Sequence, residues 1–146
     1  MSATRHIPLS QDATLVVALA STAVPFSHSA ADEAERWLRV LRLHGHVGAA
    51  LQALGIGEAP LETAAQPPDE TQDGDRLGAR AVEDVCRRAQ GWAAGRGAAC
   101  VATVDLLFAI LEVYDRLFDR ALYERGATRD ELLARLAAVE ARAGGR

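Results

Sequence analysis

The chain has 146 residues, enough for one domain with a sizeable core, and 49% of them are hydrophobic. Only 5% are aromatic, and the abundance of alanine, leucine and valine favours close-packed helices over sheets. The formal net charge of −4 argues against a nucleic-acid partner, because phosphate binding requires a surplus of basic residues on one face. We therefore expect an all-α protein that does not bind nucleic acid.

The first predicted helix follows Ser10, whose hydroxyl can cap a segment running from Gln11 to about Val24. Pro25 disfavours any continuation of this helix. The apolar run from Ala13 to Val24 has about 12 residues, whereas a bilayer-spanning helix needs roughly 20. The preceding basic residues are too sparse for a signal peptide, so we expect no membrane partner and a cytoplasmic location.

Two further helices are predicted before residue 58. Ser29 can cap the second helix, whose first turn contains the acidic residues Asp32 and Glu33. The third helix is predicted from Val47 to Leu54, with Gly55 as the residue that ends it. The second helix has one apolar face, formed by Trp37, Leu38, Val40 and Leu41.

The segment from Glu58 to Arg76 is rich in proline and acidic residues and is predicted to be a linker. The helix that follows contains a stripe of mostly small residues, which would let a neighbouring helix approach closely. Glycines at 95 and 97 are predicted to end this helix. The stripe comprises Ala79, Val82, Val85, Cys86, Ala89 and Ala93.

Three helices are predicted after residue 100. Thr103 can cap the first, which runs to Tyr114, and Gly126 ends the second. Thr128 and Glu131 have the spacing of a capping box at the start of the last helix. The chain's two cysteines, Cys86 and Cys100, lack metal-site spacing and are expected to be reduced thiols.

The two halves of the chain match each other. AALQALGIG aligns with RALYERGAT, and this alignment places Gly55 opposite Gly126, 71 residues later. The preceding helices align at an offset of 70, which pairs Trp37 with Leu107 and Leu41 with Leu111. This pattern indicates an internal duplication in which two helical units share one core.

The succession V-x-T-x-x-L-L-x-x-[LI]-L, a charged turn, A-L-x-x-x-G and a closing helix resembles the repeat of the Clp N-terminal domain. That domain lies at the front of the ClpA and ClpC unfoldases. In the first half, HGHVGAALQALGIG resembles the third helix of the repeat and its glycine stop. The second-half residues that fit the pattern are Val101, Thr103, Leu106, Leu107, Ile110, Leu111, Ala121, Leu122, Gly126 and Leu133.

The resemblance covers about residues 10–140 and implies a single domain, 1–146, in which two pseudo-symmetric four-helix repeats form one bundle. The repeats would span about 10–58 and 77–141. The family docks substrates, degrons or adaptor proteins, and its ClpC branch reads phosphoarginine through a Glu after the Thr of the second helix. Here Val104 stands at that position, and valine cannot pair with a guanidinium, which argues against phosphoarginine recognition.

Catalytic and metal-site alternatives are weaker. No phosphate-binding loop is present, so ATP hydrolysis is not expected. His44 and His46 fit a polar turn better than a metal site, and Ser29 beside His28 serves better as a helix cap than as a nucleophile. We therefore predict no catalytic activity, no cofactor and no metal. The acids Asp115, Asp119 and Glu124 alternate with Arg116, Arg120 and Arg125, which predicts an ion-paired outer face.

The leading hypothesis is a non-catalytic module that binds protein or peptide clients, an adaptor or a Clp-type unfoldase and so modulates proteolysis. Its groove would lie where the starts of the two second helices meet, and would favour an acidic or phosphorylated ligand. A small-molecule or cyclic-peptide sequestering protein and a regulator acting through homo-oligomers are the alternatives. Trp37 is expected in the core, and the candidate binding residues are Asp32, Glu33, Glu35, Trp92, Thr103, Val104 and Asp105.

Overall fold

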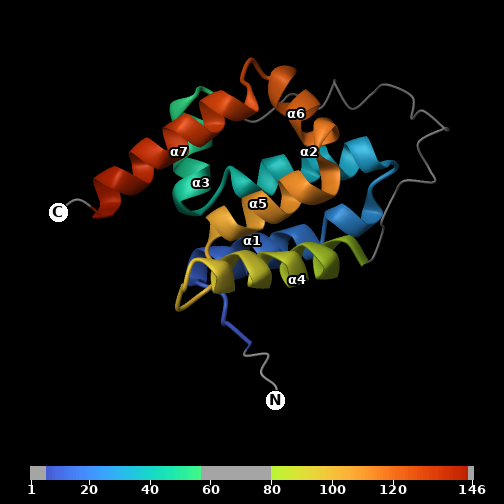
Figure 1. Cartoon of the computed structure of the whole chain (residues 1–146). Coiled ribbons are helices and arrows are strands. Elements are labelled where there is room, and N and C mark those ends of the chain that lie inside the picture. Colours follow the sequence, from blue (N-terminus) through green and yellow to red (C-terminus); the bar gives the residue numbers. More distant parts are fainter. Residues whose placement is uncertain (1–5, 57–79, 145–146) are drawn as a thin grey trace.

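The computed structural model describes residues 6–56 and 80–144 (Figure 1). Within these ranges the chain forms seven α-helices and one 3-10 helix, and no strand, which confirms the predicted all-α class. An isolated bridge joins Leu9 to Val101. The elements are α1 (Gln11–Ser21), η1 (Val24–Phe26), α2 (Ala30–Leu41), α3 (Gly45–Ala53), α4 (Arg80–Gly95), α5 (Thr103–Tyr114), α6 (Arg116–Tyr123) and α7 (Arg129–Gly144).

Three of the four helix caps predicted from the sequence are confirmed. The Ser10 hydroxyl accepts a hydrogen bond from the Ala13 N–H at 3.1 Å, and Ser29 caps α2 in the same way. Thr128 and Glu131 form the reciprocal capping box at the start of α7. α1 ends earlier than expected, at Ser21, because Pro25, which lies in the separate 3-10 turn η1, has no N–H to donate to the Ser21 carbonyl four residues earlier.

The predicted cap of α5 is wrong. Thr103 is the first helical residue, and the N-cap position belongs to Ala102. The Asp105 carboxylate, three residues after the cap, accepts a hydrogen bond from the Ala102 N–H at 2.9 Å. A carboxylate in the first turn therefore replaces the threonine hydroxyl as the capping group.

The third helices of the two halves, α3 and α6, end in the same hydrogen-bond pattern. Gly55 and Gly126 have φ values of 84° and 88°, a left-handed conformation that favours glycine. The residue after each glycine donates its N–H to the carbonyl five residues earlier, from Ile56 to Leu51 and from Ala127 to Leu122. The glycine stops predicted from the sequence are confirmed.

α5 is the central helix, with α1 and α4 along one side of it and α3, α6 and α7 towards the other (Figure 1). α4 packs along α5, and of the predicted stripe Val85, Ala89 and Ala93 are buried, Val82 and Cys86 are partly buried, and Ala79 lies outside the described residues. α2 packs on both α5 and α6, while α3 packs on α5 and α7. Trp37 is fully buried in this core, as expected.

The second helices of the two halves differ in spacing from the sequence alignment. α2 and α5 both have 12 residues, and their starts and ends are each 73 residues apart, rather than the predicted 70. Residues 6–56 form three α-helices and η1, while the end of the predicted first repeat and the linker lie outside the described residues. Within the described ranges, no helix has the length and apolar character needed to cross a bilayer.

Candidate functional site

The acidic candidates on α2 are all engaged by other groups of the same chain. Asp32 accepts a hydrogen bond from the His28 N–H and forms an ion pair with Arg36 at 3.2 Å. Glu35 is paired with Arg125 through two guanidinium hydrogen bonds of 2.9 and 3.2 Å. These carboxylates hold α2 to its own turn and to the end of α6.

Glu33 is fully buried, and its carboxylate accepts a hydrogen bond of 2.7 Å from the Tyr114 hydroxyl at the end of α5. Burial is the main factor that raises the pKa of Tyr114, and the neighbouring Glu33 raises it further. Trp37 lowers the pKa of Tyr114, but by less than burial and Glu33 raise it. The protonated phenol is therefore the form that the fold favours, and this pair acts as a buried link between α2 and α5.

The candidates at the start of α5 are also buried. Thr103 and Val104 face the interior, and Asp105 has no exposed surface. The Asp105 carboxylate receives hydrogen bonds from Arg96 at 2.8 and 2.5 Å. This pair fixes the loop between α4 and α5, and the first-turn residues of α5 are not open to a ligand.

The expected meeting of the two second-helix starts is wrong, because α2 and α5 run in opposite directions. Glu33, near the start of α2, bonds to Tyr114 at the end of α5. Gly45, just after α2, lies against Thr103 at the start of α5, so closely that a Cβ at Gly45 would be 2.5 Å from the Thr103 hydroxyl. The two helix starts are therefore separated by most of the length of α5.

Trp92 is the most exposed of the candidate residues, with 40% of its surface accessible. Its ring stacks on Phe108 of α5, with the ring centroids 4.9 Å apart and the planes inclined by 34°. This arrangement fixes a large apolar surface at the protein exterior. Trp92 is therefore both part of the α4–α5 packing and available to a second molecule.

A hollow of about 590 Å³ surrounds this aromatic pair. We call it the α4–α5 groove. Its lining includes both members of an Arg88–Glu112 ion pair of 3.5 Å near one end, and Arg96, which pairs with the buried Asp105, near the other. The groove is lined by Arg88, Gly91, Trp92, Gly95, Arg96, Phe108 and Glu112.

Of these lining residues, Trp92 is the one that was predicted from the sequence as a binding residue. Gly91 carried a usable signal, since a glycine in the interior of a helix is costly and usually has a packing or functional reason. Phe108 carried no such signal, because its apolar side chain fits the core pattern of α5 and only the structure shows that it is half-buried.

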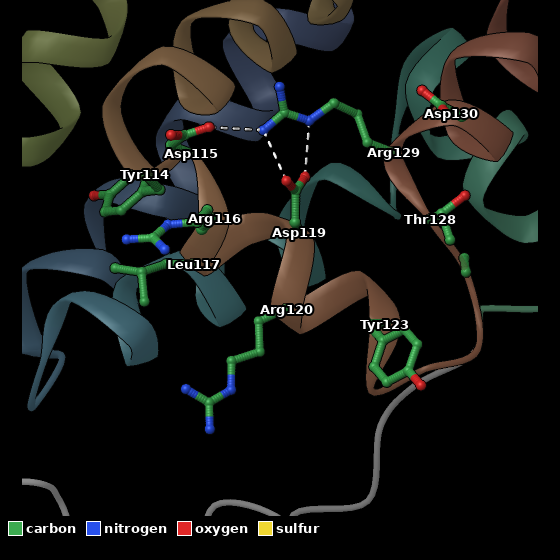
Figure 2. A pocket seen from close by; sticks show the side chains of 11 residues that line it. Tyr114, Asp115, Arg116, Leu117, Asp119, Arg120, Tyr123, Thr128, Arg129 and Asp130 are labelled. Atoms are coloured by element: carbon green, nitrogen blue, oxygen red, sulfur yellow. Dashed lines mark hydrogen bonds and ion pairs between the residues drawn. The ribbon is translucent and has the colours of Figure 1, made fainter.

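A second hollow, of about 1110 Å³, lies where α5, α6 and α7 meet (Figure 2). Arg129 donates two hydrogen bonds to Asp119, at 2.8 and 3.0 Å, and one to Asp115 at 3.1 Å. In Figure 2 both carboxylates point towards Arg129, whereas the side chains of Arg120 and Tyr123 extend away from that cluster. Arg129 is thus shared between two carboxylates, and these hydrogen bonds fix the start of α7 on α6.

The predicted ion-paired face therefore exists. Some of its ion pairs join sequence neighbours, and others join residues that are distant in sequence. Arg120 pairs with Glu124 at 3.6 Å, whereas Arg125 pairs with Glu35 on α2. Arg116 makes no ion pair with any described residue. The face serves chiefly to join helices that are distant in sequence.

The histidines of the HGH sequence lie at the turn between α2 and α3. His44 occupies the N-cap position of α3, and the His46 ring lies 3.9 Å from the Glu140 carboxylate on α7. Among the residues that the structure describes, no group of three or more histidine, cysteine or acidic side chains is arranged to hold a metal ion. The turn connects α2 and α3, as predicted.

No protein-family model matches the chain, and no curated protein matches it.

Proposed function

We propose that the chain is a non-catalytic protein- or peptide-binding module of the Clp N-terminal type, and that it docks its partner through the α4–α5 groove. The observation that carries the proposal is the half-exposed Trp92, held in a fixed position on Phe108. Tryptophan is enriched among the residues that dominate binding energy at protein interfaces. An ordered aromatic surface also loses little conformational entropy on binding.

The architecture supports the family part of the proposal. The two third helices end in matching glycine motifs 71 residues apart, and α2 packs on α6 while α3 packs on α5. Crossed packing of this kind is what two copies of one helical unit sharing a core would produce. In this interpretation the module delivers a client or adaptor to a partner that carries out proteolysis.

The acidic candidates need no external ligand under this proposal. Asp32, Glu35 and Asp105 each have an arginine partner in the chain. A guanidinium group of a ligand, that of phosphoarginine included, would have to displace an arginine already held by charge-assisted hydrogen bonds. Recognition therefore rests on the aromatic groove.

The test is capture of interacting proteins from extracts of the producing organism with three forms of the full chain. The wild type is compared with Gly91→Leu, which fills the groove, and with Ala94→Leu, which adds the same side chain at an exposed position outside it. We expect a partner that is retained by the wild type and Ala94→Leu but lost by Gly91→Leu. A partner that all three forms retain equally would contradict docking in the groove.

A small-molecule or cyclic-peptide binder is the second candidate, because the groove volume of about 590 Å³ lies in the range of ligand pockets. Thermal unfolding with a compound panel separates this function from protein docking. A ligand at 100 times its dissociation constant adds about 2.7 kcal/mol to the stability. Stabilisation of the wild type but not of Gly91→Leu would favour the small-molecule function.

A further inference from the structure

We propose that the occupant of the α4–α5 groove is an amphipathic α-helix of a partner protein. It places an apolar side chain over Gly91 and Trp92 and an acidic side chain beside Arg96. This inference rests on the proposed binding function and adds the chemistry of the partner segment.

The shape of the groove favours a helix over an extended segment. The groove follows α4 from Arg88 to Arg96, about two helical turns. Its sides are helices, and the described residues contain no strand whose edge could pair with an extended peptide. A helix satisfies its own backbone hydrogen bonds, whereas an extended segment in an apolar groove would leave its N–H and C=O groups unpaired.

Two glycines open the floor of the groove to a close approach. Gly91 and Gly95 lie one turn apart on α4, and a Cβ added at either position would meet no atom within 4 Å. Neither has the left-handed φ that would make glycine necessary for the backbone. The fold thus has no steric need for glycine here, although glycine weakens a helix interior. Space above two adjacent turns is what a partner helix needs to pack at short interaxial distance.

The charged side chains at the rim of the groove indicate where an acidic side chain of the partner helix would lie. The Arg96 side chain is 46% exposed, whereas its partner Asp105 is completely buried. An approaching molecule therefore meets the guanidinium edge but not the carboxylate. At the opposite end, Arg88 is already shared between Asp84 and Glu112, and the Glu112 side chain is 43% exposed. An acidic side chain fits the Arg96 end of the groove and finds no free cation at the other.

The test uses a library of helical peptides of about 16 residues, long enough for four turns, displayed on phage and selected on the immobilised full chain. Gly91→Leu and Ala94→Leu serve as the counter-selection and the matched control. A second groove variant, Gly91→Ala, keeps the test valid if leucine disturbs folding. We expect the selected peptides to have a common pattern, an apolar residue and an acidic residue one helical turn apart. They should bind Ala94→Leu but not Gly91→Leu.

Variants of individual peptides then test the helical conformation and the acidic residue separately from the proposed binding function. Replacing the shared acid with glutamine should weaken binding about fivefold or more, and a central proline should abolish it. Groove-dependent peptides that contain a central proline, or that carry a basic residue at the shared position, would overturn the helix or the charge assignment and leave the binding function standing. Peptides that bind Gly91→Leu as well as the wild type, or no enrichment at all, would overturn both.

Discussion

Substitution of Gly91 by alanine should stabilise the isolated protein. Gly91 lies inside α4, and its added Cβ would enter open space, with no atom within 4 Å. Alanine is favoured over glycine in a helix interior by about 0.5–1 kcal/mol, mainly because glycine loses more backbone entropy on folding. With no clash to offset this gain, the free energy of unfolding should rise by about that amount.

The assay is urea unfolding of the full chain followed by circular dichroism, with thermal unfolding as a second readout. For a chain of this size the gain corresponds to an increase of about 1–4 °C in Tm. Ala18→Gly provides the internal scale, because Ala18 is exposed in the middle of α1 and its replacement should cost a similar free energy.

A loss of stability in Gly91→Ala would refute this reasoning, since it would mean that the position is in close contact within the free protein. An unchanged stability alongside a clear loss in Ala18→Gly would also contradict an open groove floor. The expected combination, a more stable protein with weaker partner binding, would show that Gly91 is retained for the groove and not for the fold.

Three further predictions concern the pairs that hold the helices together. Arg125→Ala should cost about 1.5–3 kcal/mol in urea unfolding, because it removes charge-assisted hydrogen bonds to a carboxylate on α2; a loss below 0.5 kcal/mol, typical of exposed pairs, would contradict this. Because burial and the Glu33 hydrogen bond raise the pKa of Tyr114 above its unfolded value, its stabilisation is complete below about pH 10 and is lost as the pH rises further. The urea midpoint of unfolding should therefore decrease as the pH is raised above about 10, and this decrease should be less steep in Tyr114→Phe. Equal slopes of midpoint against pH in the two forms would exclude Tyr114 as a cause. Burial, and then a nearby acid, raise the pKa of Cys86, so a Cys100→Ser variant should react with a thiol reagent about tenfold or more slowly when folded than in urea, and equal rates would contradict its burial.

The local signals in the sequence predicted local structure well. The caps at Ser10 and Ser29 and the stops at Gly55 and Gly126 depend on atoms within a few residues, so the sequence contains all the necessary information. The stripe on α4 likewise predicted a close helix contact, which α5 provides. Within the described residues these features define the starts of α1 and α2 and the ends of α3 and α6.

The arrangement of the candidate site could not be predicted in the same way. The bond between Arg125 and Glu35 joins residues 90 positions apart, and the antiparallel course of α2 and α5 decides which ends meet. Carboxylates that were predicted to bind a ligand are instead paired with arginines of the same chain. Asp105 illustrates this point, since it caps its own helix and binds Arg96 while fully buried.

The most direct test of the central claim is the solvent accessibility of Trp92 in the bound state. Acrylamide quenching of tryptophan fluorescence is measured for the full chain, free and with a tryptophan-free bound peptide, and the Trp92→Phe form supplies the contribution of the buried Trp37. Binding should strongly reduce the quenching of Trp92 and leave that of Trp37 unchanged. Quenching of Trp92 that stays the same when the partner is bound would contradict docking in the α4–α5 groove.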